Sequence, residues 1–413
     1  HNSDWINSYI DTHMLPDAIA AGIDTVIMAP GGSPSTIANE IQTVKNAGYT
    51  IHYTALMNEP DKREGWDKAG NLSKFLDLHN QLASRGLATK QICCDDANVD
   101  DDAKERIDGI LNDSDAKNYL AALSTHSYSM AGESDYAQRA FDSGKDWWMT
   151  EHCTEGTSNP TDYDKASVSS NTMLNDLNQG VTHWIYFIGY GLSEVSLPNV
   201  HSNVFLAYYD QSSFGKPVGS NWFVFGAQYH YFRQINQTFP FGTQFRMTTS
   251  IGLPSTDMVW TYGTRSPINI AVGKRPDGRW GIAISNASVD SPAGSWNEDY
   301  TVHLDITELH GSGSKPFKAM RSGPTSGFES AQDDIVLVDG KATVQVNKSE
   351  LLTLYTNSGT VSSHPQSVKS KHSGNRFRLV VDGNQIRVFR NATSNKITLQ
   401  GRKGDNLMEA VSR

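Results

Sequence analysis

Cysteines and long hydrophobic runs are scarce in this sequence, and an excess of basic charge is missing. The chain has three cysteines among 413 residues, too few for a disulfide framework. No apolar run approaches the roughly 18 residues needed to cross a bilayer, so we expect no membrane span. Lys and Arg number 35 against 45 Asp and Glu, a formal charge of −10, which argues against a nucleic-acid binder. This composition instead fits an enzyme that acts on a neutral or weakly charged polymer.

The three cysteines leave two interpretations open. Cys93 and Cys94 are adjacent, whereas Cys153 lies well apart in the chain. A bond from Cys153 to either of the others is conceivable, but buried free thiols are the expectation. The His, Cys and acidic residues show no metal-ligand spacing, so we expect neither a metal nor another cofactor.

What the sequence does contain is a regular alternation of strand and helix patterns. Short apolar runs alternate with segments whose apolar residues recur at helical spacing, which is typical of an α/β fold with a parallel sheet. The six expected strands lie at 24–29, 51–58, 90–95, 119–127, 146–151 and 182–188. Because a (β/α)8 TIM barrel has eight strands, we expect a barrel that is N-terminally incomplete. Another chain, a rearranged segment or nothing would cover the two open edges.

The pattern changes near residue 245 to short alternating strands, which predict an all-β sandwich. Just before the change, the aromatics of 222–232 have helical spacing and predict the last barrel helix. The expected sandwich strands lie at 258–262, 268–272, 280–284, 301–304, 335–338, 343–346 and 351–355. The expected domains are a barrel at 1–245, a β-sandwich at 246–357, a linker at 358–375 and a small basic β tail at 376–413.

Two of the expected barrel strands end on a glutamate. The run 51–58 leads into Glu59 and Pro60, and the run from 146 ends at Glu151. Because Pro60 cannot donate to a sheet ladder, it helps to stop the strand and leaves Glu59 at the rim, where parallel barrels carry out chemistry. Two carboxyl groups about 5–5.5 Å apart are the requirement of a retaining glycosidase. The pair therefore predicts this chemistry.

Three segments resemble the marker segments of glycoside hydrolase family 30 in clan A. They are Met57–Asp61, Thr125–Tyr128 and Lys145–Glu151, and the resemblance extends over roughly residues 20–356. It implies a retaining hydrolase of a plant cell-wall β-glycan, and we expect an endo-β-1,4-xylanase that degrades xylan.

The same resemblance implies roles for individual residues. Glu59 would be the acid/base and Glu151 the nucleophile. The implied substrate-binding residues are Asn58, His126, Tyr128, Trp184, Tyr186 and His152. Among them, Tyr128 would donate to the nucleophile, and Trp184 would form the floor on which a sugar ring stacks. Packing roles remain open for His126 and for Trp184.

Two features depart from the family pattern. In the glucuronoxylan-specific branch, the last strand continues into arginines that bind the glucuronic acid branch, whereas here Tyr186 is followed by Phe187. An acidic substituent would lack that bidentate partner, so dependence on glucuronic acid is not expected. The arginine that clan A enzymes supply from their second strand also has no counterpart, because that strand is not in this chain.

Other functions stay open at this point. Within the same family they are a β-1,6-glucanase, a β-1,6-galactanase or an exo-acting β-glycosidase. From another class, the chain would be a non-catalytic carbohydrate-binding remnant with an unclosed barrel. We expect a polysaccharide partner and a secreted protein, since the basic tail resembles small β tails of exported bacterial enzymes.

Overall fold

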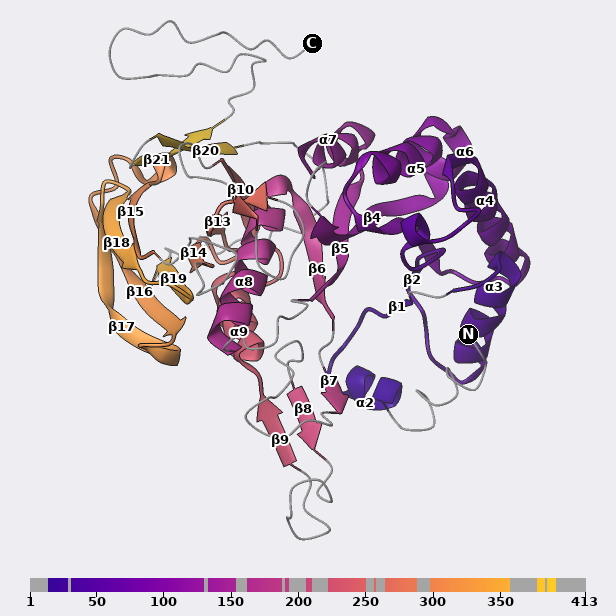
Figure 1. The fold of residues 1–413 in the computed structure, drawn as a ribbon, viewed down its shortest axis with the longest axis horizontal. Coiled ribbons are helices and arrows are strands. Elements are labelled where there is room, and N and C mark those ends of the chain that lie inside the picture. The colour runs from indigo at the N-terminus through magenta and orange to yellow at the C-terminus, as the bar shows by residue number, and fades with distance from the viewer. Residues whose placement is uncertain are drawn as a thin grey trace, which may run out of the picture.

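The computed structural model contains a parallel half-barrel and an antiparallel β domain, with two helices between them (Figure 1). It describes residues 14–28, 31–129, 133–153, 162–187, 190–192, 206–209, 222–249, 256–257, 264–287, 298–356, 377–382 and 385–390. None of the helices in these segments is long and apolar enough to span a membrane.

The half-barrel is one sheet whose six parallel strands follow each other in chain order. They are β1 (Ile27–Met28), β2 (Tyr53–Thr54), β3 (Lys90–Asn98), β4 (Leu120–Ser129), β5 (Asp146–His152) and β6 (Val181–Tyr186). Each strand falls at an expected position, which confirms the α/β prediction. Among the described strands, none pairs with the outer edge of β1 or of β6. The barrel is therefore partial, as its strand count predicts.

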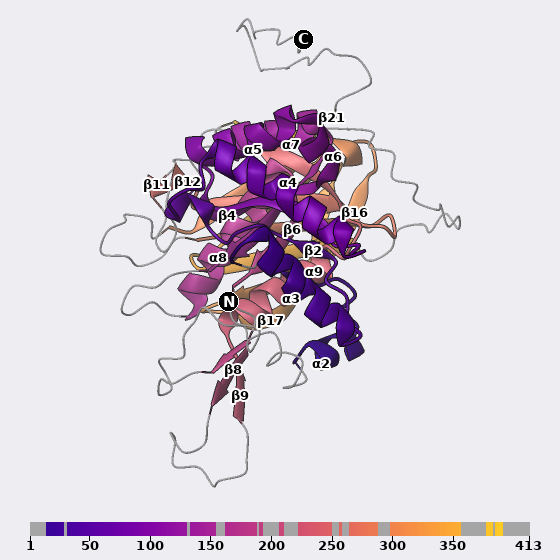
Figure 2. The same cartoon turned by 90° about the vertical axis from the view of Figure 1, so that its right-hand side faces the viewer.

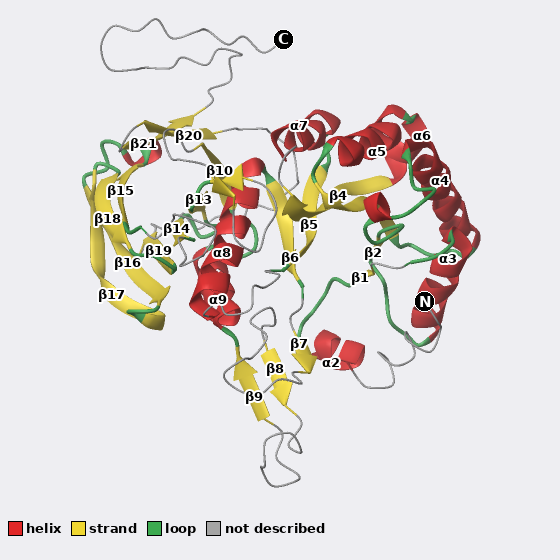
Figure 3. Cartoon of the chain, in the orientation of Figure 1, coloured by secondary structure: helices red, strands yellow, loops and turns green. Residues whose placement is uncertain are grey.

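Helices cover the outer face of this sheet (Figures 2 and 3). They are α3 (Pro34–Asn46), α4 (Lys68–Ser84), α5 (Asp101–Asn112), α6 (Ser114–Tyr119), α7 (Glu133–Ser143) and α8 (Asp162–Gln179), whereas α2 (Met14–Ala20) lies apart from them. Helix α3 shows why such segments are helical: the Ser33 side chain accepts from the Thr36 N–H and Pro34 occupies the first turn. Its buried residues Ile37 and Ile41 lie one turn apart and face the core.

Neighbouring residues of a strand point to opposite faces of the sheet. On β5, Trp147 points outward, where it packs against Tyr136 of α7 and donates its indole N–H to Thr125 Oγ1 over 2.8 Å. The next residue, Trp148, points inward and packs with Ile92 and Ala122 of the adjoining strands. The half-barrel thus has an apolar layer on each side of the sheet.

The β domain is built from one ten-stranded sheet. Its order is β15 (Tyr300–Asp305), β18 (Lys341–Val346), β17 (Gly327–Val338), β16 (Ser314–Gly323), β19 (Glu350–Thr356), β14 (Trp280–Asn286), β13 (Ile268–Lys274), β10 (Gln244–Thr249), β20 (Phe377–Asp382) and β21 (Gln385–Arg390). Val302 and Val344 near one edge share a core with Ile270 and Ile282 nearer the other, so the sheet folds over this core. The expected antiparallel domain is present, but as a continuous sheet instead of two separate ones.

Sequence patterns missed part of this sheet. Strand β16 and the first half of β17 were not expected: β16 begins with Ser, Lys and Pro, and the first half of β17 has no buried residue. The hairpin of β20 and β21 lies where the tail strands were expected, and β20 pairs in parallel with β10. The expected strand at 258–262 and the linker at 358–375 lie outside the described residues.

The segment 222–232 corrects a prediction. Its first residues form β9 (Trp222–Phe225), which pairs with β8 (Leu206–Tyr209), beside β7 (Tyr190–Leu192). Helix α9 (Ala227–Thr238) begins only after Gly226. The spacing of the aromatics suits a helix, but pairing with a neighbouring strand overrides local spacing in the first four residues.

Helices α8 and α9 connect the two parts of the molecule. Leu174 of α8 and Tyr231 of α9 share a core with Ala271 of β13 and Ala283 of β14. Polar contacts reinforce this core: Asn171 of α8 is fully buried, and its Nδ2 donates to the carbonyl oxygens of Pro267 and Ser285 over 3.1 and 3.2 Å. The barrel and the β domain therefore share one interface through these helices.

Candidate active site

A cleft opens at the rim of the half-barrel, where the parallel strands end. Its volume is about 720 Å³. It is lined by residues from the ends of β3 to β6 and from the loops after β1 and β2, among them Asn58, Asp95, His126, Glu151, Tyr186 and Phe187. Parallel barrels bind their ligands at this end of the sheet.

Glu59 and Glu151 meet at this rim although they are far apart in sequence. A carboxyl oxygen of each lies within 4.8 Å of the other, and the His126 ring is within the same distance of both. Glu59 has a left-handed backbone (φ 53°), its N–H donates to the Asp95 carbonyl over 3.0 Å, and Pro60 then starts the short helix η1 (Pro60–Lys62). The sharp turn after β2 thus aims Glu59 toward Glu151.

His126 controls the charge of Glu59. Its Nδ1 lies 3.3 Å from Glu59 Oε1 and 3.8 Å from Glu151 Oε1, and the ring is buried. The hydrogen bond with His126, aided by Lys62 Nζ at 3.0 Å, lowers the pKa of Glu59 to about 2 against the effect of burial. Burial alone would lower the pKa of His126, but the Glu59 hydrogen bond and the charges of Asp95, Glu151 and Glu59 raise it. In the open cleft, the proton therefore resides on His126 and Glu59 is ionised.

Tyr128 lies beside Glu151. Its hydroxyl donates to Glu151 Oε1 over 2.9 Å and lies 3.3 Å from Cys153 Sγ. Burial, together with Cys153 and Glu151, raises the pKa of the Tyr128 phenol far above its usual range. The phenol therefore keeps its proton and can stabilise the ionised form of Glu151.

Two polar residues of the cleft were not expected from the sequence. Asp95 is buried, has a left-handed backbone (φ 58°) and accepts from Thr150 Oγ1 over 2.7 Å. Arg63 lines the cleft, and its Nε donates to the Asn58 carbonyl over 3.3 Å. Asp95 follows an apolar run, the same signal that identified Glu59 and Glu151. Arg63 lies in a polar loop and gave no such signal.

The fold is similar to those of solved glycoside hydrolases. A family 30 endoxylanase from Clostridium papyrosolvens has a TM-score of 0.52 at 15% identity, covering 79% of this chain and 71% of that chain. A family 30 subfamily 8 xylanase from Clostridium acetobutylicum has a TM-score of 0.52 at 15% identity, covering 79% and 72%. SrfJ from Salmonella typhimurium has a TM-score of 0.52 at 14% identity, covering 80% and 65%.

The chain has a glycoside hydrolase fold. No family model and no curated protein matches the sequence. The resemblance inferred from the motifs is thus matched at the level of the fold, and the cleft lies at the end of the barrel where such folds carry out chemistry.

Within this glycoside hydrolase fold, some of the remaining expected site residues line the cleft and others are packed away from it. Asn58 and Tyr186 line the cleft. Trp184 points away from it: its indole N–H donates to Asp176 Oδ2 of α8 over 2.7 Å and its ring stacks on Phe232 of α9. It packs the strand against helices, so the floor role expected for Trp184 is corrected to the packing role.

His152 is likewise fully buried and packed. Its Nδ1 lies 3.1 Å from the Ser127 hydroxyl, and its ring contacts those of Tyr128, Trp184 and Tyr186. It does not line the cleft, so it supports the walls of the site instead of contacting a ligand.

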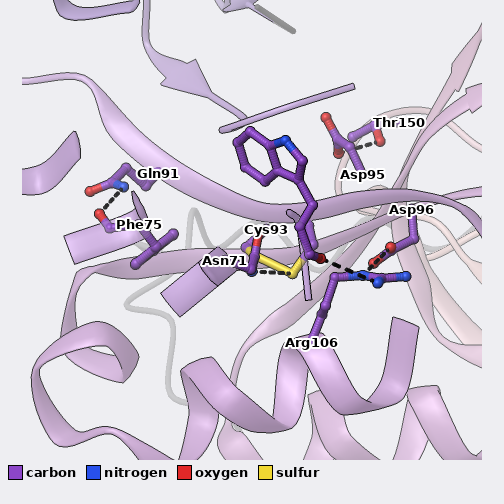
Figure 4. Close-up of a disulfide and its surroundings, with 10 residues drawn as sticks. Asn71, Phe75, Gln91, Cys93, Asp95, Asp96, Arg106 and Thr150 are labelled. Carbon is purple, nitrogen blue, oxygen red and sulfur yellow. Dashed lines mark hydrogen bonds and ion pairs between the residues drawn. A yellow bond between two sulfur atoms is a disulfide. The ribbon is translucent and has the colours of Figure 1, made fainter. Parts of the chain in front are cut away.

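The cysteine expectation needs one correction. Cys93 and Cys94 form a disulfide, and Asn71 Nδ2 of α4 lies within 3.4 Å of both sulfurs (Figure 4). Adjacent cysteines meet without any tertiary contact, whereas Cys153 lies beside Tyr128. Cys153 is free and buried, as expected.

The described residues include one group with the spacing of metal ligands, formed by Glu59, His126 and Glu151. Sequence spacing could not reveal it, because the three residues come from three different strand ends. The Lys62 ammonium, 3.0 Å from Glu59 Oε2, adds positive charge beside the group. This charge opposes a bound cation and suits a site that handles protons.

Proposed function

We propose that this protein is a retaining glycoside hydrolase that cleaves a plant cell-wall β-glycan, with endo-β-1,4-xylanase as the favoured activity. One observation carries the proposal: carboxyl oxygens of Glu59 and Glu151 lie within 4.8 Å at the rim of a parallel half-barrel. Retaining enzymes hold their two carboxyl groups about 5–5.5 Å apart, and inverting enzymes about 6.5–9.5 Å. The short separation supports double displacement.

Glu151 is the proposed nucleophile. The Tyr128 hydroxyl donates to its Oε1 over 2.9 Å, and such a donor favours the ionised carboxylate that must attack the anomeric carbon. Attack forms an ester between Glu151 and the sugar while the bond from the anomeric carbon to the leaving oxygen breaks. Asn58, which lines the same cleft, would bind the hydroxyl next to the anomeric carbon, where a hydrogen bond can strengthen in the transition state.

Glu59 is the proposed acid/base, and His126 supplies its proton. Because the pKa of Glu59 is lowered to about 2, the carboxyl group does not hold its own proton at neutral pH. The imidazole, 3.3 Å away, passes a proton to Glu59 as negative charge develops on the leaving oxygen that Glu59 protonates. In the second step, Glu59 takes a proton from the water that hydrolyses the ester.

The proposed substrate is inferred from the fold and from the residue that follows the last barrel strand. Two of the similar structures are described as xylanases, which favours xylan. Phe187 follows Tyr186 in place of arginine, so the proposed enzyme does not depend on a glucuronic acid branch. Since a cell-wall polymer lies outside the cell, we propose a secreted enzyme with its chemistry in residues 1–245 and the β domain in residues 246–357.

Substitution of the two glutamates tests the proposal. Glu151→Ala should lower hydrolysis by about 10⁴-fold. Glu59→Ala should retain slow turnover of an aryl glycoside with a good leaving group, and azide should restore its rate by replacing the water that needs a base. Glu64→Ala, an exposed glutamate in the next loop, is the matched control and should leave the rate unchanged. Near-normal activity of either active-site variant on polymer would overturn the assignment.

A panel of polysaccharides separates the related activities. A β-1,4-xylanase releases oligomers from xylan and leaves β-1,6-linked glucan and galactan untouched. Release of sugar from a β-1,6-linked polymer would instead identify a β-1,6-glucanase or a β-1,6-galactanase, and release of single sugars from chain ends would identify an exo-β-glycosidase.

A carbohydrate-binding remnant is the second candidate, and the open barrel favours it. Among the described strands, β1 has only two residues and the outer edges of β1 and β6 are unpaired. Isothermal titration with xylo-oligosaccharides distinguishes the two functions when it is run beside an activity assay. Binding without any product would identify the remnant.

A further inference from the structure

The groups around Tyr128 determine which atom donates in each of its two hydrogen bonds. A phenol carries one hydrogen, and a carboxylate oxygen can only accept. The Tyr128 hydrogen therefore goes to Glu151 Oε1, 2.9 Å away. Cys153 Sγ lies 3.3 Å from the same phenol oxygen, so the thiol must be the donor in that second contact.

We propose that Cys153 is a positioning residue that orients Tyr128 toward Glu151. The chain of donors runs from Cys153 S–H to the Tyr128 oxygen and from Tyr128 O–H to Glu151 Oε1. This inference rests on the proposed function, in which Glu151 is the nucleophile, and adds a residue to which the motifs assign no role.

The surroundings of Cys153 hold the thiol in this position. It is 4% exposed and packs with Ala97, Tyr186 and Phe232, which come from β3, β6 and α9. An apolar pocket favours a neutral thiol over a thiolate, and only the neutral thiol can donate. Three separate elements thus fix the sulfur against the phenol.

Donation from the thiol acts on the phenol in two ways. It occupies one lone pair of the phenol oxygen, which leaves the O–H directed at Glu151. It also polarises the O–H group, since hydrogen bonds in a chain strengthen one another by roughly 10–30% per bond. Loss of the thiol should therefore weaken stabilisation of the ionised Glu151 without removing any group that touches the sugar.

Other titratable groups lie around Glu151 and Tyr128, and the experiment must separate them from Cys153. They are Glu59 and Lys62 from the loop after β2, Asp95 from β3, His126 from β4, His152 from β5 and Tyr186 from β6. His126 Nδ1, at 3.8 Å, is the nearest charged partner of Glu151 Oε1 that the described residues provide. A His126→Asn variant therefore serves as the reference for pH profiles.

A double-mutant cycle tests the kinetic consequence. Cys153→Ala should lower kcat/KM on an aryl xyloside by about 5-fold and move the acidic limb of the pH profile upward, whereas Cys153→Ser, which keeps a donor, should retain the rate within about 2-fold. In a Tyr128→Phe background the loss caused by Cys153→Ala should disappear, because the thiol acts only through the phenol. The same loss in both backgrounds, or no loss in either, would overturn the proposal.

Infrared spectroscopy tests the hydrogen bond without relying on activity. The S–H stretch of Cys153, isolated by subtracting the spectrum of Cys153→Ala, should move to higher wavenumber in Tyr128→Phe, since the acceptor is lost. An unchanged S–H stretch would overturn the proposal even if the kinetics agreed. A shifted stretch in a protein without any hydrolase activity would support the hydrogen bond and overturn the proposed function, so the two failures are distinguishable.

Discussion

His126 Nδ1 lies 3.3 Å from Glu59 Oε1, so one imidazole and one carboxyl group share a hydrogen bond at the rim of the half-barrel. The contact lowers the pKa of Glu59 and raises that of His126. Together the two groups hold one proton, and the protein's proposed acid is a pair instead of a single carboxyl group.

This pairing predicts the pH dependence of activity. In the native protein, the alkaline limb of kcat/KM reports loss of the shared proton and should lie above the ordinary His pKa of about 6.5. In His126→Asn, the proton must sit on Glu59 itself. The pKa of Glu59 then rises from about 2 toward its ordinary value, which is still below that of His126. The alkaline limb should therefore move to lower pH in a stopped assay on an aryl glycoside. An unmoved limb would show that another group holds the proton.

Phe187 should contribute to substrate binding. It lines the cleft, its side chain is 47% exposed, and its ring contacts no other ring among the described residues. An exposed aromatic face can stack on the apolar face of a sugar, a contact worth roughly 0.5–1.5 kcal/mol. Phe187→Ala should raise KM for xylan about 5-fold and leave kcat and the melting temperature unchanged.

The matched control for this prediction is Phe241→Ala. Phe241 is 96% exposed and lies between α9 and β10, away from the cleft. Its removal should leave KM unchanged. Equal KM values for the two variants would remove Phe187 from the binding site.

Asp96 should make stability depend on pH. Its Oδ1 accepts from Arg106 Nε over 2.6 Å (Figure 4), and burial raises the pKa of Asp96 to about 7 although Arg106 opposes the shift. Between about pH 4 and pH 7 the folded protein keeps a proton that the unfolded chain has lost, so stability falls as pH rises through this window. Asp96→Asn should flatten this part of the curve of unfolding free energy against pH. Equal slopes in both proteins would contradict the assignment.

Asn171 should couple the barrel to the β domain. It donates to Pro267 and Ser285 and accepts from Asn269 Nδ2 over 2.9 Å. Asn171→Leu leaves these buried groups unpaired and should cost about 3 kcal/mol of unfolding free energy. Helix α8 contacts β6 of the barrel through Asp176 and shares a core with β13 and β14. The substitution should therefore lower the midpoint of one shared transition in urea denaturation. Asn46→Leu, at an exposed position, is the control and should leave the unfolding free energy unchanged. Two separate unfolding transitions would contradict the shared core.

The sequence predicts the order of the parallel strands and the meeting of the two glutamates, because apolar runs and strand ends leave clear local signals. It does not predict which face of β6 points into the barrel. His183 lies on one face of that strand and Trp184 and Tyr186 lie on the other, and a shift of one residue exchanges the two faces. The structure turns His183 inward against Trp148 and Trp184 outward against α8 and α9.

Other features depend on contacts that no local pattern encodes. The position of His126 between two carboxyl groups depends on three strands meeting at one rim. The direction of the Cys153 hydrogen bond depends on Tyr128 already donating to Glu151. Such relationships follow from the placement of neighbouring strands in the sheet, so they can be derived only once the strands are placed.

The central claim is that Glu151 forms a covalent bond with the sugar. The most direct test is to incubate the protein with an activated 2-deoxy-2-fluoro-β-xyloside, which slows breakdown of the intermediate, and to locate the added mass by peptide mass spectrometry. We expect one sugar per chain, attached to Glu151, and no label in Glu151→Gln. A label on Glu59, or turnover of the parent xyloside without any trapped sugar, would contradict it.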